Sequence, residues 1–460
     1  MSRDARLRSP CMPPRPALFR RKLDRDVRRA VSAEGCWITD ENGRRYLDAS
    51  GGAMVANLGH GGEFARRIAE AMAGATRSTG YVNGTQFTNP WAEELADALA
   101  RHLPEPLRHS YFLASGSEAV EAAVKLARQV QLDRGEAGRW KVISLQPSYH
   151  GNTLAALALS GREHARAPFA PMLPNFPRID GPDGYRDPEG LESAAERLEE
   201  AILREGSATV AAFLAESIGG SSTGARVPPA KYFQNVRDIC DRHGVMWIAD
   251  EVMCGMGRTG KWFACEHFGA VPDLMVLGKG LNAGAVPLSA VVATSAIVET
   301  VARARGSFLH AQTYSHTPAI CAAGLETVRI LEEHRLVERV AELQSTFFEA
   351  LGPVSKDGWV GDLRGKGFLA GVELVADGAS KKPFDRSTRI AERVTEAAFE
   401  RGLIVWPNVG HIAHGEWKGR GDILMLGPPF TISEDEMQEA ARRLLGAIED
   451  VRGQGVDSVT

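Results

Sequence analysis

Four short apolar runs in the middle of the chain lack any alternation of apolar and polar positions. The runs are Lys141–Leu145, Thr209–Ala215, Val245–Ala249 and Asp273–Leu277. Strands that are buried on both faces of a parallel sheet have this pattern. Helical patterns at Gly190–Arg204 and Lys231–His243 separate some of these runs. We therefore predict βαβ units and an α/β fold built on a mostly parallel sheet.

The C-terminal part of the chain has a different pattern. Its predicted elements are an amphipathic helix at Thr388–Arg401, strands at Gly402–Pro407 and Asp422–Leu426, a glycine-rich loop at Asn408–Gly421, and a helix from Ser433 to about Ile448. Gly402 suits the position after a helix, and Ser433 begins a capping box with Glu436. These elements predict a smaller α+β domain.

The composition excludes several classes of protein. The chain has 460 residues, and its 54 basic and 58 acidic residues give a net charge of −4 with neutral histidines. This near balance argues against a nucleic-acid-binding protein, which needs a basic face. No apolar run reaches the roughly 20 residues of a membrane-spanning helix. The six cysteines are scattered and form no metal-ligand cluster, so we expect a reducing, cytoplasmic compartment and no metal site.

The first thirty residues are rich in arginine and contain Pro10, Pro13, Pro14 and Pro16, but they have no apolar segment. A secretory signal needs such a segment and is therefore excluded. We expect a flexible arm that packs on a neighbouring subunit. A transit peptide is the alternative, which the prolines and the scarcity of serine disfavour.

A possible anion site lies at Ser115-Gly116-Ser117-Glu118, directly before a helical pattern. Backbone N–H groups, two hydroxyls and the positive end of the helix dipole would all face an anion such as phosphate. Ser115 and Glu118 also fit a plain capping box, so this segment alone leaves both interpretations open.

Two ionisable residues follow buried strands. Asp250 ends the run VMWIAD, and Lys279 follows DLMVLG between two glycines. A carboxylate at the carboxyl end of a parallel strand faces the ligand crevice, where a protonated ring nitrogen would be a suitable partner. A lysine in this place can lose its proton and form a Schiff base. Taken alone, Asp250 could equally be a helix cap and Lys279 a surface lysine.

Tyr149 and His150 follow the first of the four strands. An aromatic ring there can stack on a flat cofactor, although a tyrosine at the rim of the core is the simpler explanation for Tyr149 alone. The anion site, the aromatic ring, Asp250 and Lys279 together describe one ligand. It has a phosphate, a flat ring with a basic nitrogen, and an aldehyde, which are the groups of pyridoxal 5′-phosphate (PLP).

Further motifs extend over nearly the whole chain after its first thirty residues or so. They are LDASGGAMVANLGH at 47–60, ASGSEAVEAAVKLAR at 114–128, YHGNT at 149–153, a stretch at 226–281 that contains DEVMCGMGRTG, TYSHTP at 313–318, RGKGFLAGVEL at 364–374 and LGPPFTIS at 426–433. With these motifs the chain resembles the class III, or ω-amino acid type, aminotransferases of PLP fold type I. The DEVMCGMGRTG stretch is highly specific.

The resemblance implies a role for each matching residue. Lys279 would form the Schiff base with the cofactor, and Asp250 would pair with its ring nitrogen. The other implied cofactor contacts are Gly116 and Ser117 with Ser115 at the phosphate, Tyr149 with His150 on one ring face, Val252 under the other face, Glu216 near the phenolic edge, and Thr313 reaching the phosphate from a neighbouring subunit. This last contact implies a homodimer with shared active sites.

The resemblance also implies a domain layout. Residues 1–60 would form an N-terminal arm and part of a small domain. Residues 61–325 would form a large PLP-binding domain on a mostly parallel seven-stranded sheet. Residues 326–460 would complete the small α+β domain.

The implied reaction moves an amino group from an amine or ω-amino compound to a 2-oxo acid such as pyruvate by a ping-pong mechanism. Lys279 would carry the proton as general base and acid. A PLP-dependent 2,1-aminomutase or decarboxylase on the same fold is the alternative. The stretch at 255–260 also fits GxGxxG, but it does not join a strand directly to a helix, which disfavours a nicotinamide-linked dehydrogenase.

The substrate side departs from the family pattern. Many relatives carry an arginine for the substrate carboxylate at one of two positions, where this chain has Trp406 and Met425. Arg420 is a substitute candidate. The expected pocket walls are apolar or aromatic: Met54, Tyr81, Phe87 and Trp406. They predict a bulky or long-chain apolar amine donor.

Overall fold

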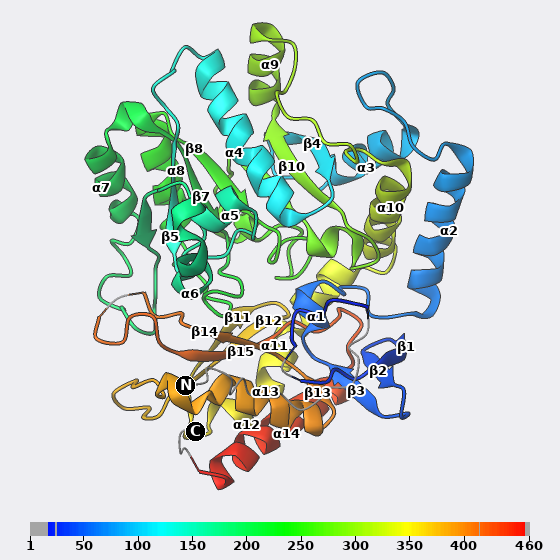
Figure 1. The fold of residues 1–460 in the computed structure, drawn as a ribbon, viewed down its shortest axis with the longest axis vertical. Helices are drawn as coiled ribbons and strands as arrows, with labels where there is room; N and C mark the ends of the chain where they lie inside the picture. Colours follow the sequence, from blue (N-terminus) through cyan, green and yellow to red (C-terminus); the bar gives the residue numbers. More distant parts are fainter. Residues whose placement is uncertain (1–16, 24, 414, 456–460) are drawn as a thin grey trace, which may run out of the picture.

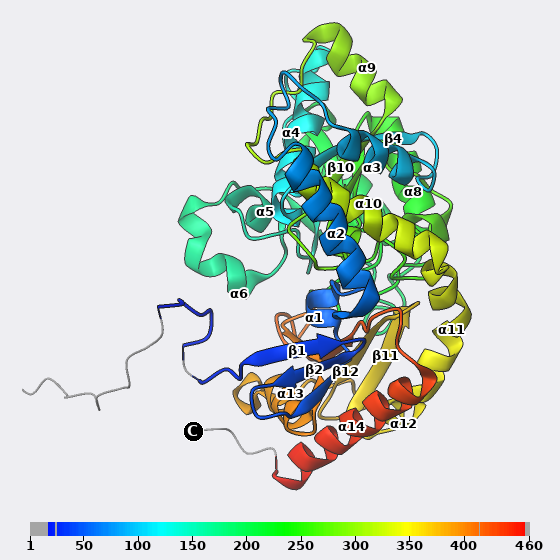
Figure 2. The same cartoon turned by 90° about the vertical axis from the view of Figure 1, so that its right-hand side faces the viewer.

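The computed structural model describes residues 17–23, 25–413 and 415–455, and it has two parts. A large part surrounds a seven-stranded sheet, and a smaller part lies below it in Figure 1. Residues 1–16, which include the four prolines of the predicted arm, lie outside the described residues. Figure 2 shows that strand β1 (Ala30–Glu34) and the C-terminal helix α14 (Glu434–Gly453) both belong to the smaller part.

The seven-stranded sheet has the order β4-β10-β9-β8-β7-β5-β6. Its strands are β4 (Leu107–Leu113), β5 (Lys141–Gln146), β6 (Arg178–Asp180), β7 (Val210–Glu216), β8 (Met246–Asp250), β9 (Leu274–Leu277) and β10 (Ser289–Thr294). Neighbours from β9 to β6 pair in parallel, and β10 is antiparallel to both β9 and β4. The mostly parallel seven-stranded sheet is therefore confirmed.

Helices cover both faces of this sheet (Figure 1). They are α2 (Gly62–Ser78), α3 (Pro90–Ala100), α4 (Gly116–Asp133), α5 (Leu154–Leu159), α6 (Glu163–Arg166), α7 (Glu196–Glu205), α8 (Tyr232–His243), α9 (Ser295–Ala304) and α10 (Pro318–Glu333), with short 3-10 helices η1 (Ala167–Met172), η2 (Ser207–Thr209), η3 (Ala264–Phe268) and η4 (Lys279–Asn282). Ala212 and Ile248 pack against α4 on one face, while Phe213 and Trp247 pack against α7 and α8 on the other. Burial on both faces explains the unbroken apolar runs.

The smaller part contains two four-stranded sheets, β1-β2-β3-β13 and β11-β12-β15-β14. Its remaining elements are β2 (Trp37–Asp40), β3 (Arg45–Asp48), α1 (Gly51–Met54), α11 (Leu336–Ala350), α12 (Gly352–Ser355), β11 (Val360–Lys366), β12 (Leu369–Leu374), η5 (Arg386–Thr388), α13 (Ile390–Glu400), β13 (Leu403–Ile404), β14 (Trp406–Val409) and β15 (Asp422–Leu426). Strand β13 pairs in parallel with β3, so the first sheet joins N- and C-terminal segments. The division of the chain at residues 60 and 325 stays a prediction.

The predicted helix ends agree with the structure at three positions. Ser115 and Ser433 are the N-caps of α4 and α14, and each forms a complete capping box. Gly402 follows α13 with a φ of 75°, a left-handed conformation that glycine adopts without strain. Helix α14 runs to Gly453, beyond the predicted end.

Two predicted elements are wrong. The helix expected at Gly190–Arg204 begins only at Glu196. Asp187 accepts hydrogen bonds from the backbone N–H of Gly190 and from Arg197, which hold the preceding segment in a turn.

The single strand expected at Gly402–Pro407 is two strands in different sheets. Strand β13 pairs with β3, and β14 pairs with β15, with Val405 at the crossing. An apolar run shows that a segment is buried, but it does not show which sheet buries it. In the described part of the chain, no helix is both long and apolar enough to cross a membrane.

Candidate active site

The residues predicted to bind the cofactor lie where parallel strands of the large sheet end. Glu216 ends β7 and Asp250 ends β8, and the two are register partners in adjacent strands. Lys279 lies just beyond β9, at the start of η4. The segment after β5 and the start of α4, which follows β4, reach the same edge of the sheet (Figure 1). Ligands of open α/β sheets bind at this edge.

The carboxylate of Asp250 is buried and is held on both oxygens. Its Oδ2 accepts a hydrogen bond from Nδ1 of His150 at 2.7 Å, and its Oδ1 accepts one from the backbone N–H of Val252 at 3.1 Å. Nε2 of His150 is enclosed and has no hydrogen-bond partner among the described residues. His150 and Val252 therefore fix the orientation of a negative charge at the end of β8.

The amine of Lys279 is adapted for reaction by its surroundings. Burial lowers its pKa to about 8, although the carboxylates of Asp250 and Glu216 act in the opposite direction. A lysine with this pKa is a neutral nucleophile in half of the molecules at pH 8. Its φ of 43° lies in the left-handed region, which costs a non-glycine residue about 1–2 kcal/mol. Such strain often occurs at functional sites.

Two glycines bring three segments close together beside Lys279. A Cβ atom on Gly116 would lie 3.1 Å from Cγ1 of Val252, and one on Gly278 would lie 3.3 Å from the same atom. Val252 therefore packs against bare backbone from the start of α4 and from the end of β9. A side chain in either place would displace it.

The start of α4 forms the predicted capping box, and the anion site expected there stays a prediction. The hydroxyl of Ser115 accepts the backbone N–H of Glu118 at 3.3 Å, so this serine is used by the capping box. Oγ of Ser117 accepts the backbone N–H of Asn152 at 3.2 Å, which ties the helix start to the loop after β5. The N–H groups of the first helical turn have no acceptor within the helix and remain suited to an anion.

Glu216 is a buried acid at the end of β7. Its Oε1 accepts the backbone N–H of Gly220 at 2.9 Å. Burial raises the pKa of Glu216, and the nearby charge of Asp250 adds to this effect. Glu216 therefore holds its proton more readily than an exposed glutamate.

One residue near the site was not predicted from the sequence. The guanidinium of Arg162, which follows α5, lies over the ring of Tyr149, with its Cζ atom 4.7 Å from the ring centroid. Its Nε and Nη2 donate to the hydroxyls of Ser222 and Ser221 at 2.7 and 2.5 Å. Nothing in the sequence around Arg162 distinguishes it from a surface arginine, because the fold alone brings these two loops together.

The structure brings together part of the predicted substrate pocket. Met54 is buried in the same hydrophobic cluster as Met425, and Trp406 packs against this cluster. Trp406 and Met425 are direct partners in adjacent strands. The two positions at which a carboxylate-binding arginine was looked for in the sequence therefore belong to one apolar cluster, in which Met54 and Met425 are buried and Trp406 is half-buried.

The other predicted substrate and partner contacts lie on the surface of this single chain. The side chains of Tyr81 and Phe87 are 54% and 65% exposed, and Thr313 lies in an exposed turn. Arg420 is exposed too. Hydrogen bonds from Ser387 and the charge of Arg420 lower the pKa of Asp385, which places Arg420 beside that acid. The roles predicted for these four residues stay predictions.

The GxGxxG stretch has a packing role in this structure. It forms turns and is not the start of a helix. Arg258 is buried and donates hydrogen bonds to the backbone carbonyls of Phe368 and Pro428 at 3.1 and 2.5 Å and to Oδ1 of Asn57 at 2.6 Å. Gly257 has a φ of 88° and leaves no room for a Cβ atom beside Phe430. The stretch therefore connects the two parts of the fold and does not have the strand-to-helix geometry of a dinucleotide-binding motif.

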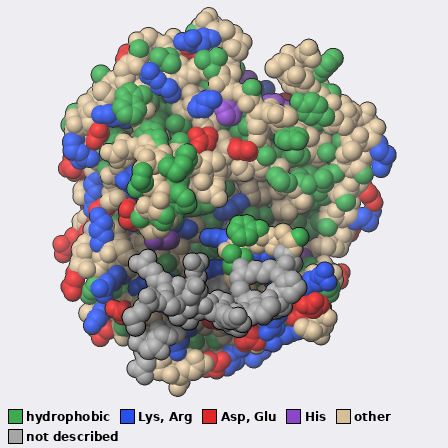
Figure 3. All heavy atoms as spheres, in the orientation of Figure 1, with side chains coloured by type: hydrophobic (Ala, Val, Ile, Leu, Met, Phe, Trp, Pro, Cys, Tyr) green, Lys and Arg blue, Asp and Glu red, His purple; other side chains and the backbone are tan. Residues whose placement is uncertain are grey.

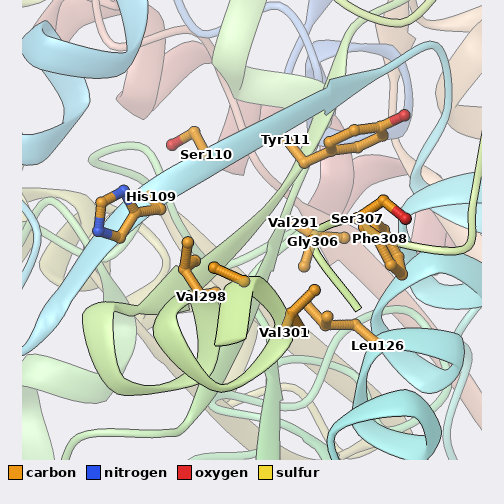
Figure 4. A pocket seen from close by; sticks show the side chains of 12 residues that line it. His109, Ser110, Tyr111, Leu126, Val291, Val298, Val301, Gly306, Ser307 and Phe308 are labelled. Atoms are coloured by element: carbon orange, nitrogen blue, oxygen red, sulfur yellow. The ribbon is translucent and has the colours of Figure 1, made fainter. Parts of the chain in front are cut away.

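A separate apolar cavity of about 280 Å³ lies between β4, β10, α4 and α9 (Figure 4). Tyr111 and Phe308 line it, whereas Lys279, Asp250 and Tyr149 do not.

On the face drawn in Figure 3, basic and acidic side chains are intermingled, in keeping with the small net charge.

Comparison with known proteins identifies the family. The sequence model named "Aminotransferase class-III" matches residues 21–448. The chain is 38% identical to the uncharacterized aminotransferase YodT of Bacillus subtilis over 88% of this chain and 91% of that one. It is 33% identical to the putrescine–pyruvate aminotransferase of Pseudomonas aeruginosa over 92% and 90% of the two chains. The ω-transaminase of Pseudomonas jessenii in complex with PMP (pyridoxamine 5′-phosphate) superimposes with a TM-score of 0.85 at 30% identity, covering 93% of each chain.

These matches cover nearly all of the chain, and its α/β architecture is that of PLP fold type I. The chain belongs to the class III aminotransferases and is a PLP-dependent transaminase.

Proposed function

We propose that this transaminase moves an amino group from an amine or ω-amino compound with a bulky or apolar substituent to a 2-oxo acid such as pyruvate, in two half-reactions of ping-pong type. The observation that carries the proposal is the amine of Lys279. Its pKa is about 8, and it lies within electrostatic reach of Asp250 and Glu216 at the strand ends. Such an amine can both bind an aldehyde and carry a proton.

The residues at this edge fit the cofactor. The bare backbone at Gly116 and Gly278 leaves room beside Val252. We assign the start of α4 with Ser117 to the phosphate, Tyr149 and Val252 to the ring faces, Asp250 to the ring nitrogen, Glu216 to the phenolic edge and Lys279 to the aldehyde. When bound, PLP withdraws electrons from the substrate carbon that must lose its proton.

The side chains then have separate tasks. Asp250 holds the proton on the ring nitrogen, and His150 keeps the carboxylate in position through its 2.7 Å hydrogen bond. Lys279 would take the proton from the substrate carbon and deliver it to the carbon of the cofactor's aldehyde group. Only a neutral amine can take this proton, so the pKa of Lys279 sets the pH at which transfer becomes fast.

The acceptor half-reaction should therefore depend on pH through Lys279. The pKa of Lys279 is about 8, so its amine is protonated at lower pH. We expect the rate with pyruvate to rise about tenfold per pH unit up to that value and then to level off. Stopped-flow absorbance of the aminated enzyme between pH 6 and 10 measures this profile. A flat profile would remove Lys279 as the base.

Crowding at the phosphate site should weaken cofactor binding. In the Gly116→Val variant, the added side chain collides with Val252, whose Cγ1 lies 3.1 Å from the position of the new Cβ. We expect the Kd for PLP to rise by at least about tenfold. Fluorescence titration of the apoenzyme measures this change. Gly74→Ala on α2, where a Cβ meets open space, is the matched control. Equal affinities for all three proteins would contradict the assignment.

The proposed donor is an amine with an apolar substituent, because Trp406 and Met425 stand at the expected positions of a carboxylate-binding arginine and belong with Met54 to one apolar cluster. The putrescine–pyruvate aminotransferase supports this proposal, since its name gives a donor without a carboxylate and pyruvate as the acceptor. Half-reaction rates over a panel of amines test it. Preference for glutamate or ornithine over apolar amines would overturn it.

We also propose a homodimer with shared active sites. Thr313, which was predicted to reach the phosphate of the neighbouring subunit, is exposed on the single chain, as expected of a side chain that contacts a partner. Sedimentation velocity of the holoenzyme measures the oligomeric state, and a stable active monomer would contradict the proposal.

The five described cysteines are unpaired and buried, in keeping with the expected cytoplasmic location.

The reaction itself is tested by one spectroscopic experiment. An amine donor should convert the absorbance of the PLP form to that of the aminated form, and pyruvate should restore it. An aminomutase would need no oxo acid, and a decarboxylase would release carbon dioxide. A donor that turns over fully without consuming an oxo acid would therefore overturn the proposed transfer.

A further inference from the structure

Arg162 carries a half-buried guanidinium that forms no ion pair in the described part of the chain, although the charge of Glu216 acts on it. Its Nε and Nη2 donate to two serine hydroxyls, and it forms no ion pair with an acid in the described part of the chain. Nη1 has no hydrogen-bond partner there, and it is not among the fully enclosed polar atoms, so a small molecule can reach it. Burial lowers the pKa of Arg162, the charge of Glu216 raises it, and the charge of Arg21 in the N-terminal segment acts in the same direction as burial.

Two buried arginines have the carboxylate partners that Arg162 lacks. Arg226 and Arg186 pair with the buried carboxylates of Asp183 and Glu373, each at 2.5 Å. Arg258 donates to three oxygens of neighbouring segments. A guanidinium that contacts mainly two hydroxyls and an aromatic ring still has a positive charge and N–H donors available for an anion.

The position of Arg162 connects it to the reaction. Its guanidinium lies 4.7 Å from the ring centroid of Tyr149, after β5, and its serine partners belong to the loop that follows Glu216 and β7. Its charge is close enough to lower the pKa values of both Lys279 and Glu216. Figure 2 shows α5 and α6, which flank Arg162, at the level where the large part meets the smaller one.

We propose that Arg162 binds the carboxylate of the 2-oxo acid acceptor. This inference rests on the proposed function. A 2-oxo acid carries its carboxylate next to the reacting carbonyl, so the counter-charge must lie close to Lys279. The planar fork of an arginine can bind both carboxylate oxygens. Arg420, the candidate chosen from the sequence, is instead an exposed neighbour of Asp385.

The arrangement separates two classes of substrate. An amine donor without a carboxylate has no group for a cationic partner, so it does not need Arg162. Pyruvate, and alanine in the reverse direction, does need it. Removal of the charge should therefore affect one half-reaction and spare the other.

The test compares Arg162→Gln, Arg162→Lys and the wild-type holoenzyme. We expect Arg162→Gln to lower kcat/KM for pyruvate by about 100-fold and to change the rate with the neutral acceptor butanal, or with the donor benzylamine, by less than about threefold. Arg162→Lys, which keeps the charge, should recover part of the loss. Arg166→Gln on α6, whose arginine is paired with Glu163, is the matched control and should behave as wild type.

A binding measurement keeps the test independent of turnover. Propanoate, an unreactive carboxylate, should bind wild-type holoenzyme at least about tenfold more tightly than it binds Arg162→Gln, as measured by calorimetry. Equal propanoate affinities, or equal losses with pyruvate and butanal, would overturn the inference and leave a purely structural role for Arg162. Failure of the wild type to aminate any oxo acid would instead overturn the proposed function.

Discussion

Replacement of Lys279 by alanine is expected to lower the rate of amino transfer by about 10⁴-fold or more, because the substitution removes both the covalent link to the cofactor and the proton carrier. The fold should persist, since the side chain fills no part of the hydrophobic core. PLP should still bind through its phosphate and ring contacts, but without a covalent link.

Borohydride reduction followed by peptide mass spectrometry measures this link directly. In the wild type the cofactor should be fixed on the peptide that contains Lys279, and in Lys279→Ala it should be removed by dialysis. The exposed Lys261 offers a matched control, because Lys261→Ala changes the same kind of side chain on the connection between β8 and β9. Covalent fixation at another lysine would contradict the assignment.

Asp250→Asn is expected to lower the rate of amino transfer by about 10³-fold. The amide has nearly the shape of the carboxylate and can still accept the hydrogen bond from Nδ1 of His150. It has no charge, however, so the ring nitrogen of PLP loses the partner that keeps it protonated. The expected defect is therefore chemical and not structural.

This variant should retain PLP with an affinity within about tenfold of wild type, while the rate of proton removal from a deuterated amine donor shows the main loss. The exposed Asp238 on α8 provides the matched control Asp238→Asn. An Asp250→Asn enzyme with wild-type rates would show that the ring nitrogen needs no acid here.

The edge of the large sheet that carries Asp250 and Lys279 was predictable, because the ends of the strands define it. Asp250 and Lys279 each follow an apolar run, and the carboxyl ends of neighbouring parallel strands meet at one edge. The position of each residue in the sequence therefore already places it in space. The same reasoning does not reach Arg162, which follows a short helix in an irregular connection. Its serine partners come from a different connection, and no periodicity relates the two.

Errors in the predicted elements have a similar origin. Ala194 and Ala195 are buried as a helical stripe would require, but hydrogen bonds from Asp187 hold the segment before Glu196 in a turn. Every residue of the run from Leu403 to Pro407 is buried or half-buried, yet the run belongs to two sheets in succession. Hydrophobicity predicts burial well, whereas the choice of partner depends on segments that are distant in the sequence.

The hydrogen bonds of Arg258 have a mechanical consequence. A hinge opening between the two parts of the molecule would strip a buried cation of its contacts with Phe368 and Pro428, at roughly 1.5–3 kcal/mol for each charged hydrogen bond. These contacts of Arg258 therefore resist a relative movement of the two parts beside the proposed cofactor site. Adaptation to substrates of different size then falls to the surface loops and to individual side-chain rotations.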